Sequence, residues 1–227
     1  METRVVLNFP GKVTMLKKLK HELIDLLNEL PAHNLVCLTS GNVSIRDQAS
    51  GLILIKPSGM PFESIHGEDI VILDPGGQIV DGRRKPSSDT FSHLYIYRHM
   101  PHVNGIVHTH SMYAASFAAL GRDIPVYITE TAEEFGGEVP CTDFVLIGDE
   151  QIGQQVVKYG QHRSAVLLKK HGVFTFAATA RRAVDLAILV ENSAHIAWLA
   201  LQLGQPEGIT PEDIRQLYDR QQNVYGQ

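Results

Sequence analysis

The sequence predicts a single α/β domain in which a central, mainly antiparallel β-sheet is covered by helices. Short apolar runs separated by polar turns in the first third of the chain are typical of a meander of neighbouring strands. Further along, strand-like and helical patterns alternate. The length of 227 residues suits one α/β domain, and no linker or low-complexity segment divides the chain. We therefore expect residues 1–227 to form one domain.

The predicted meander follows a helix. Residues 15–30 carry leucines at three-and-four spacing with charged residues between them, which predicts an amphipathic helix that ends at Pro31. Each apolar run after this helix is bounded by turn-forming residues, and we expect each run to be a strand. The runs are residues 35–38, 43–45, 52–55 and 70–73.

The alternating part of the chain begins at residue 87. Residues 87–99 have helical spacing and a capping start, residues 103–110 form a strand that is rich in β-branched side chains, and residues 111–120 are an Ala-rich helix. The same criteria predict strands at 125–128, 144–147, 165–168 and 173–177, and helices at 150–159, 180–203 and from 210 onward. The polar tail, residues 218–227, is expected to be mobile.

Composition excludes several classes of protein. Hydrophobic residues make up 44% of the chain, charged residues 20%, and the net charge is −5. No basic cluster indicates a nucleic-acid partner. Cys37 and Cys141 are far apart, so neither a disulfide framework nor a thiolate metal site is expected. The first 12 residues lack the apolar core of a signal peptide, and no apolar run reaches the about 18 residues of a membrane span. We therefore expect a cytoplasmic protein with no membrane partner.

Two histidines at the end of the strand at residues 103–110 are the strongest chemical signal. His108 and His110 lie two residues apart, and side chains at that spacing on a strand share one face. His171 stands before a glycine, and Asp89 follows two serines. Imidazole and carboxylate ligands suit a zinc-type catalytic site with one open coordination position. Taken alone, the His-x-His pair could equally be two hydrogen-bonded histidines without a metal.

Three polar turns form a second candidate site, for one phosphate. Glycine lets backbone N–H groups approach an anion, Ser and Asn add neutral donors, Lys adds a charge, and a helix N-terminus favours negative charge. The candidate residues are Gly41, Asn42, Lys56, Ser58, Gly59, Ser87 and Ser88. Each turn is ordinary turn chemistry by itself. The adjacent Asp89 nevertheless places a candidate metal ligand beside the third turn, which suits an enzyme that acts on a small phosphorylated substrate.

At these motifs the chain resembles the class II aldolase family, which includes zinc-dependent fuculose-phosphate aldolases and ribulose-phosphate 4-epimerases. The matching stretches are residues 40–44, 56–59, 85–90, 105–111, 139–141 and 171–172. The resemblance implies a class II aldolase-like fold and the phosphate site described above. It also implies that His108, His110 and His171 hold Zn²⁺, or another divalent transition metal, with Asp89 beside it.

One position within the family favours the epimerase branch. The epimerases resemble this chain in having aspartate after the two serines, as at Asp89, whereas the fuculose-type aldolases have glutamate there as a general base. The resemblance also implies that Glu133 and Tyr225 are the proton-transfer residues. The chain departs from the epimerase pattern around Glu133, where Glu-Glu-Phe-Gly-Gly replaces an aspartate that is followed by aromatic residues. This departure leaves the sugar phosphate open, but it does not affect the metal site.

The activity that this resemblance implies is L-ribulose-5-phosphate 4-epimerisation. The family epimerises C4 by retro-aldol cleavage, rotation of the aldehyde fragment and re-addition, with one acid/base group on each face of the aldehyde. If the fragments escape, the same site is an aldolase of the fuculose- or rhamnulose-phosphate type. A catalytically silent, adducin-like assembly module is a further alternative, and a His-x-His metal hydrolase another. The resemblance also implies a homotetramer with active sites between subunits. The tail that carries Tyr225 can help catalysis only if something orders it, and a neighbouring subunit is the candidate.

Overall fold

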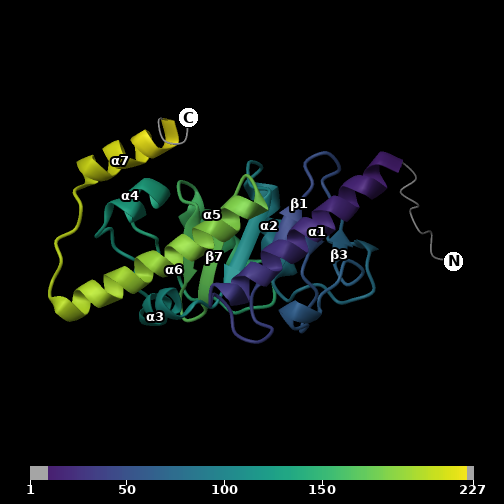
Figure 1. Cartoon of the computed structure of the whole chain (residues 1–227), viewed down its shortest axis with the longest axis horizontal. Coiled ribbons are helices and arrows are strands. Elements are labelled where there is room, and N and C mark those ends of the chain that lie inside the picture. Colours follow the sequence, from purple (N-terminus) through teal and green to yellow (C-terminus); the bar gives the residue numbers. More distant parts are fainter. Residues whose placement is uncertain (1–9, 224–227) are drawn as a thin grey trace.

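The predicted fold class is confirmed by the computed structural model, which describes residues 10–223, with only the backbone described for residues 10–13 (Figure 1). Seven strands form one sheet in the order β4-β3-β2-β1-β5-β7-β6, and every neighbouring pair is antiparallel. The strands are β1 (Asn42–Arg46), β2 (Ile53–Ile55), β3 (Val71–Leu73), β4 (Ile79–Asp81), β5 (Gly105–Thr109), β6 (Ala165–Leu168) and β7 (Gly172–Ala177).

Helices cover both faces of this sheet. They are α1 (Pro10–Ala32), α2 (Thr90–His99), α3 (Met112–Leu120), α4 (Thr129–Phe135), α5 (Gln151–Gly160), α6 (Ala180–Leu203) and α7 (Pro211–Asn223), with a short 3₁₀ turn at Phe62–Ser64. Figure 1 shows α1 and α6 lying across the same face, and α7 beside α4 at one end of the molecule. Of the helices within residues 10–223, α6 alone has the length and composition of a membrane span. It packs on β5, β7 and α3, so it is a core helix.

The alternation of side chains along β5 sets up the two layers. Val107 packs with α1 and α6, whereas Ile106 packs with α2 and α5. In β7, Phe174 points to the α2 layer, and Val173 points to the layer that contains α3, α4 and α6. Successive residues of a strand face opposite sides. His108, which is two residues after Ile106 and stacks on Phe174, therefore faces the α2 layer.

The end of α1 differs from the prediction. Pro31 lies inside the helix, which continues to Ala32, and Asn34 adopts a left-handed conformation (φ 58°). Asn34 N–H donates to Pro31 O and Leu35 N–H donates to Leu30 O, which is the hydrogen-bond pattern of a Schellman cap. The predicted strand at 35–38 is therefore wrong, because its first residue closes the helix.

Four further predictions need correction. Residues 125–128 and 144–147 are not strands. The first segment follows an isolated Ile124–Val139 bridge and accepts a hydrogen bond from Ile209 N–H at Val126 O. The second segment exposes three apolar side chains, those of Phe144, Leu146 and Ile147. Conversely, α4 and the edge strand β4 were not predicted. α2 begins at Thr90 rather than at residue 87, and α7 extends to Asn223, so residues 218–223 of the expected mobile tail are helical.

Candidate metal centre

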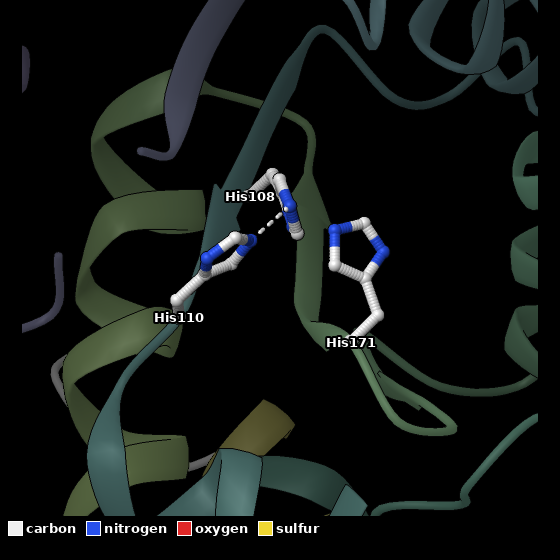
Figure 2. A group of neighbouring side chains, drawn as sticks. All are labelled: His108, His110 and His171. Atoms are coloured by element: carbon white, nitrogen blue, oxygen red, sulfur yellow. Dashed lines mark hydrogen bonds between the residues drawn. The ribbon is translucent and has the colours of Figure 1, made fainter. Parts of the chain in front are cut away.

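Three histidine side chains converge where β5 ends beside β7. His108 is in β5, His110 follows the strand directly, and His171 lies in the turn between β6 and β7 (Figure 2). The ligand atoms of the three rings all lie within 4.8 Å of one another, and His110 Nε2 is 3.0 Å from His108 Nε2. A metal ion that accepts imidazole nitrogens at about 2.0 Å could be held by these three rings.

Tight backbone packing brings His171 to this place. Lys170 takes a left-handed conformation (φ 60°) in the turn that leads into β7. A Cβ atom on Gly172, the residue after His171, would lie 2.4 Å from Thr109 O and 2.8 Å from the His110 ring. Only glycine therefore lets the His171 turn pack against the end of β5.

The protonation of the rings suits metal binding. Burial lowers the pKa of His108 to about 3, although the Asp89 charge opposes this shift, and burial also lowers the pKa of His110 and of His171. All three rings are therefore neutral near pH 7 and can offer lone pairs. His108 Nδ1 donates to Val173 O at 2.8 Å, which leaves the Nε2 lone pair directed at the cluster.

Asp89 stands beside the histidines. Its Oδ2 atom lies 3.9 Å from His108 Nε2 and accepts a 2.7 Å hydrogen bond from Asn42 Nδ2. Burial opposes ionisation of Asp89, but the neighbouring His108 and His93 and the Asn42 amide outweigh this effect, so its pKa lies below the ordinary value. The buried group is a carboxylate that is held beside His108, one of the three candidate nitrogen ligands.

The turns predicted to bind phosphate are joined by main-chain contacts. Ser87 N–H donates to Lys56 O at 3.0 Å, and Ser58 N–H donates to Lys85 O at 2.9 Å. Asn42 Nδ2 also donates to Ser87 Oγ at 3.0 Å, which joins the first turn to the third. Ser58, Gly59 and Ser88 are exposed at the same place. Gly41 (φ +86°) is required there, since a Cβ atom would lie 2.5 Å from Val36 Cγ1 and 2.9 Å from His108 O.

Lys56 is the least ordinary residue of this group because it is only 1% exposed. Its ammonium donates to Thr39 O and Pro57 O and lies 4.8 Å from the centre of the Phe62 ring. Within residues 10–223, no carboxylate forms an ion pair with it. Burial lowers its pKa. A buried ammonium without a carboxylate partner is suited to a bound anion.

Unsatisfied polar atoms gather in the same region. Within the described chain, five buried side-chain atoms have no hydrogen-bond partner, and four belong to residues that neighbour the candidate ligands in sequence or in space. They are Asn42 Oδ1, His93 Nε2, Thr109 Oγ1 and Ser111 Oγ. Buried polar groups are normally paired, so this concentration is consistent with a site that binds polar ligands.

The two predicted proton-transfer residues are not brought to this cluster by the described part of the chain. Glu133 is a half-buried residue of α4, which packs in the α6 layer, whereas His108 faces the α2 layer. Its neighbour Glu134 binds Arg182 of α6 and accepts from Gln221 of α7. Tyr225 follows α7 and lies outside the described residues.

The polar residues beneath Asp89 were not predicted from the sequence. Ser44, His93 and Tyr97 form a buried hydrogen-bonded group between β1 and α2. Two signals in the sequence could have revealed it. Polar residues alternate with apolar ones along β1, and Asp89, His93 and Tyr97 follow one another at helical spacing.

The fold and the site together define a protein in which three histidines that could hold a metal lie beside a buried carboxylate and a candidate anion site. The chain belongs to the class II aldolase family, since residues 21–198 match the family described as Class II Aldolase and Adducin N-terminal domain. Members of this family are typically metal-dependent, and the histidine cluster could hold the metal.

Relatives and solved structures agree with this assignment. The chain is 37% identical over 210 residues to the L-ribulose-5-phosphate 4-epimerase UlaF of Salmonella paratyphi A (strain ATCC 9150 / SARB42) and of Salmonella typhi. Each match covers 87% of this chain and 91% of the relative. A structure of an L-fuculose 1-phosphate aldolase superposes with a TM-score of 0.85 at 31% identity, over 88% of this chain and 94% of that chain. Epimerase and aldolase relatives alike support an enzyme.

Proposed function

We propose that this chain is an L-ribulose-5-phosphate 4-epimerase that inverts C4 by retro-aldol cleavage and re-addition. The observation that carries the proposal is the position of Asp89. Its carboxylate is buried, faces His108 Nε2 and is held by Asn42, which supports its assignment to the proposed metal centre. Aspartate is one methylene shorter than glutamate and stays at the metal in place of reaching the substrate. The epimerase names of the relatives support the same assignment.

The metal we propose is Zn²⁺, held by His108, His110 and His171 with Asp89 beside it. When bound, such an ion acts as a Lewis acid for the ketone and stabilises the negative charge that cleavage of the C3–C4 bond creates. The residues of the chain must then supply proton transfer on both faces of the aldehyde. We assign these roles to Glu133 and Tyr225.

We propose that the joined turns bind the substrate phosphate. Gly41, Asn42, Ser58, Gly59, Ser87 and Ser88 would supply neutral donors, and Lys56 the charge. Support comes from the convergence of the turns and from the lack of a carboxylate partner for the buried ammonium within the described chain. Holding the phosphate would keep the cleaved fragment in the site, so that re-addition follows cleavage.

We further propose that residues 1–227 form one cytoplasmic domain that assembles into a homotetramer with active sites between subunits. The separation of α4 from the histidine layer supports this, since Glu133 of one subunit would serve the metal of its neighbour. Trp198, Leu199 and Leu203 of α6 also expose apolar surface. Sedimentation velocity at assay concentration tests the assembly, and a fully active monomer would contradict it.

One assay separates the two candidate activities. The purified protein is incubated with L-ribulose 5-phosphate, and the products are resolved as xylulose 5-phosphate or as glycolaldehyde phosphate plus dihydroxyacetone. We expect xylulose 5-phosphate. Free fragments as the main products would instead establish the aldolase, which the fuculose-phosphate aldolase neighbour makes the second candidate.

Variants test the residue roles in the same assay. Glu133→Gln and Tyr225→Phe should each slow epimerisation by roughly 10²-fold or more, as expected for the loss of an acid/base group, without loss of metal. Asp89→Glu should shift the products toward cleavage. An unchanged epimerisation rate in both acid/base variants would remove these roles.

A further inference from the structure

A line of polar residues joins β1 to α2 beneath the metal centre. Alternate residues of β1 face the helix, and each meets a residue of the helix face one turn further along. Asn42 bonds Asp89, Ser44 bonds His93 and Tyr97, and Arg46 donates to the Tyr97 carbonyl at 2.7 Å. We call the six residues Asn42, Ser44, Arg46, Asp89, His93 and Tyr97 the β1–α2 seam.

His93 is the central member of the seam. It is fully buried, and its backbone N–H donates to Asp89 O at 3.0 Å, so the two residues are one helical turn apart. Its ring meets Phe174 edge-on, with the ring centres 5.4 Å apart, and the His108 ring stacks on the same Phe174 at 4.7 Å. His93 therefore lies one helical turn from Asp89 and packs on the same aromatic ring as His108, the first candidate histidine ligand.

The hydrogen bonds of the seam fix the tautomer of His93. Tyr97 Oη is 2.8 Å from Ser44 Oγ but 3.5 Å from Asn104 O, so its proton goes to Ser44. Ser44 then donates to His93 Nδ1 at 2.7 Å, which places the ring proton on Nε2. This Nε2–H is buried and has no partner within the described chain, and Asp89 is the charged group that acts on His93.

We propose that His93 is a positioning residue: its ring is anchored by Ser44 and its backbone N–H donates to Asp89 O, and together these contacts keep Asp89 in place against the candidate histidine ligands. The seam is the device that sets this position: β1 fixes Tyr97 and Ser44, Ser44 anchors the His93 ring, and this anchor fixes the first turn of α2, which carries Asp89 at its N-terminus. The inference rests on the proposed metal site but not on the identity of the sugar phosphate. Residues behind metal ligands commonly change metal affinity 10- to 100-fold.

A double-mutant cycle on metal binding tests this. His93→Phe keeps the ring packing on Phe174 but removes both nitrogens, and Asp89→Asn removes the carboxylate charge. Affinity is measured with Co²⁺ alone, from its absorption bands, on the full-length protein without substrate. We expect His93→Phe to weaken Co²⁺ binding about tenfold or more in the natural background, and to have no further effect in Asp89→Asn.

Matched variants separate positioning from general stability. His99→Phe changes an exposed histidine of the same helix and should leave Co²⁺ affinity unchanged. Tyr97→Phe removes only the hydroxyl that starts the chain of donors, so it should give a smaller loss that also disappears in Asp89→Asn. If His93→Phe fails to fold, the Co²⁺ affinity of Tyr97→Phe in the two backgrounds tests the proposal by itself.

Equal losses in both backgrounds, or unchanged affinity in the His93 and Tyr97 variants, would overturn the proposal. Failure of the epimerase assay would not, because Co²⁺ binding is measured without turnover. The two proposals can therefore fail independently.

Discussion

At the scale of single residues, the proposed metal centre depends on imidazoles that the fold keeps neutral. His108 is the most buried of the three and is oriented by the Val173 carbonyl. His108→Ala should therefore abolish stoichiometric metal binding, as measured by elemental analysis after gel filtration. His99→Ala, which changes an exposed histidine of α2, should retain the metal. A full complement of metal in a variant that lacks all three histidines would disprove the site.

Lys56 should have opposite effects on stability and on substrate binding. Its ammonium is buried against backbone carbonyls and an aromatic ring, so removing the charge ends a desolvation cost. We expect Lys56→Met to unfold in urea at the same or a higher concentration than the natural protein. Its KM for the sugar phosphate should rise roughly 10- to 100-fold, because a charge-assisted contact to phosphate is lost.

The exposed Lys85 in the neighbouring turn provides the matched control for Lys56. Lys85→Met should change KM far less. A Lys56→Met protein that is strongly destabilised but binds substrate normally would assign Lys56 to the core and not to the phosphate site.

At the scale of elements, α6 controls the start of α3, and so the place of His110. Both carboxylate oxygens of Glu191 accept hydrogen bonds, from Tyr113 N–H and Ala114 N–H, each at 2.9 Å. A carboxylate at a helix N-terminus accepts hydrogen bonds from the free N–H groups there, and its negative charge interacts favourably with the positive end of the helix dipole. This cap lies directly after His110 and Ser111.

Glu191→Ala should lower the free energy of unfolding by about 1–2 kcal/mol in urea titrations and weaken metal binding as well. Glu191→Gln keeps one acceptor oxygen and should fall between the alanine variant and the natural protein. Glu207→Ala, an exposed change after α6, is the control. Full metal affinity in the alanine variant would show that α3 does not position His110.

Elements with a strong periodic pattern were the ones that sequence could predict. α6 was placed at its exact bounds because a small or apolar stripe repeats along it and a glycine follows. The predicted strand at 35–38 is wrong because Leu35 completes the cap of α1. The predicted strand at 125–128 begins with Pro125, which has no N–H group to donate to a neighbouring strand. α4 was missed because seven residues with two adjacent acids carry too short a pattern.

The site was predictable to a similar degree. His108, His110, His171 and Asp89 carry distinctive local motifs, and the fold brings them together. The partnership of Ser44 with His93 depends on how β1 and α2 are docked, which no local motif specifies. Glu133 and Tyr225 remain predictions, because their roles require a neighbouring subunit or residues outside the described chain.

At the scale of the whole molecule, the buried histidines make stability depend on pH. Burial lowers the pKa of His93 to about 4 and that of His108 to about 3, from an ordinary value of 6.5. As pH falls below about 6.5, the unfolded chain binds protons that the folded metal-free protein does not bind. Each such histidine lowers the free energy of unfolding by up to about 1.4 kcal/mol per pH unit, until the pH reaches the pKa of that histidine in the folded protein.

We therefore expect the urea midpoint of the chelator-treated protein to fall steadily from pH 7 to pH 4. In His93→Phe the urea midpoint should fall less steeply with pH, because one fewer proton is bound on unfolding. A midpoint that does not change over this interval would mean that the buried rings accept protons without cost.

The pairing of β5 with β7 also affects how the protein is made. His108 and His110 leave the ribosome well before His171, which lies at the turn into β7. The three side chains meet only when β7 has paired with β5 in the centre of the sheet. A nascent chain is thus left with two separate histidine segments, and it gains the complete ligand set only after this long-range pairing. If the three histidines hold a metal as proposed, loading is a late event of biosynthesis, because the complete ligand set exists only in molecules in which β7 has paired with β5.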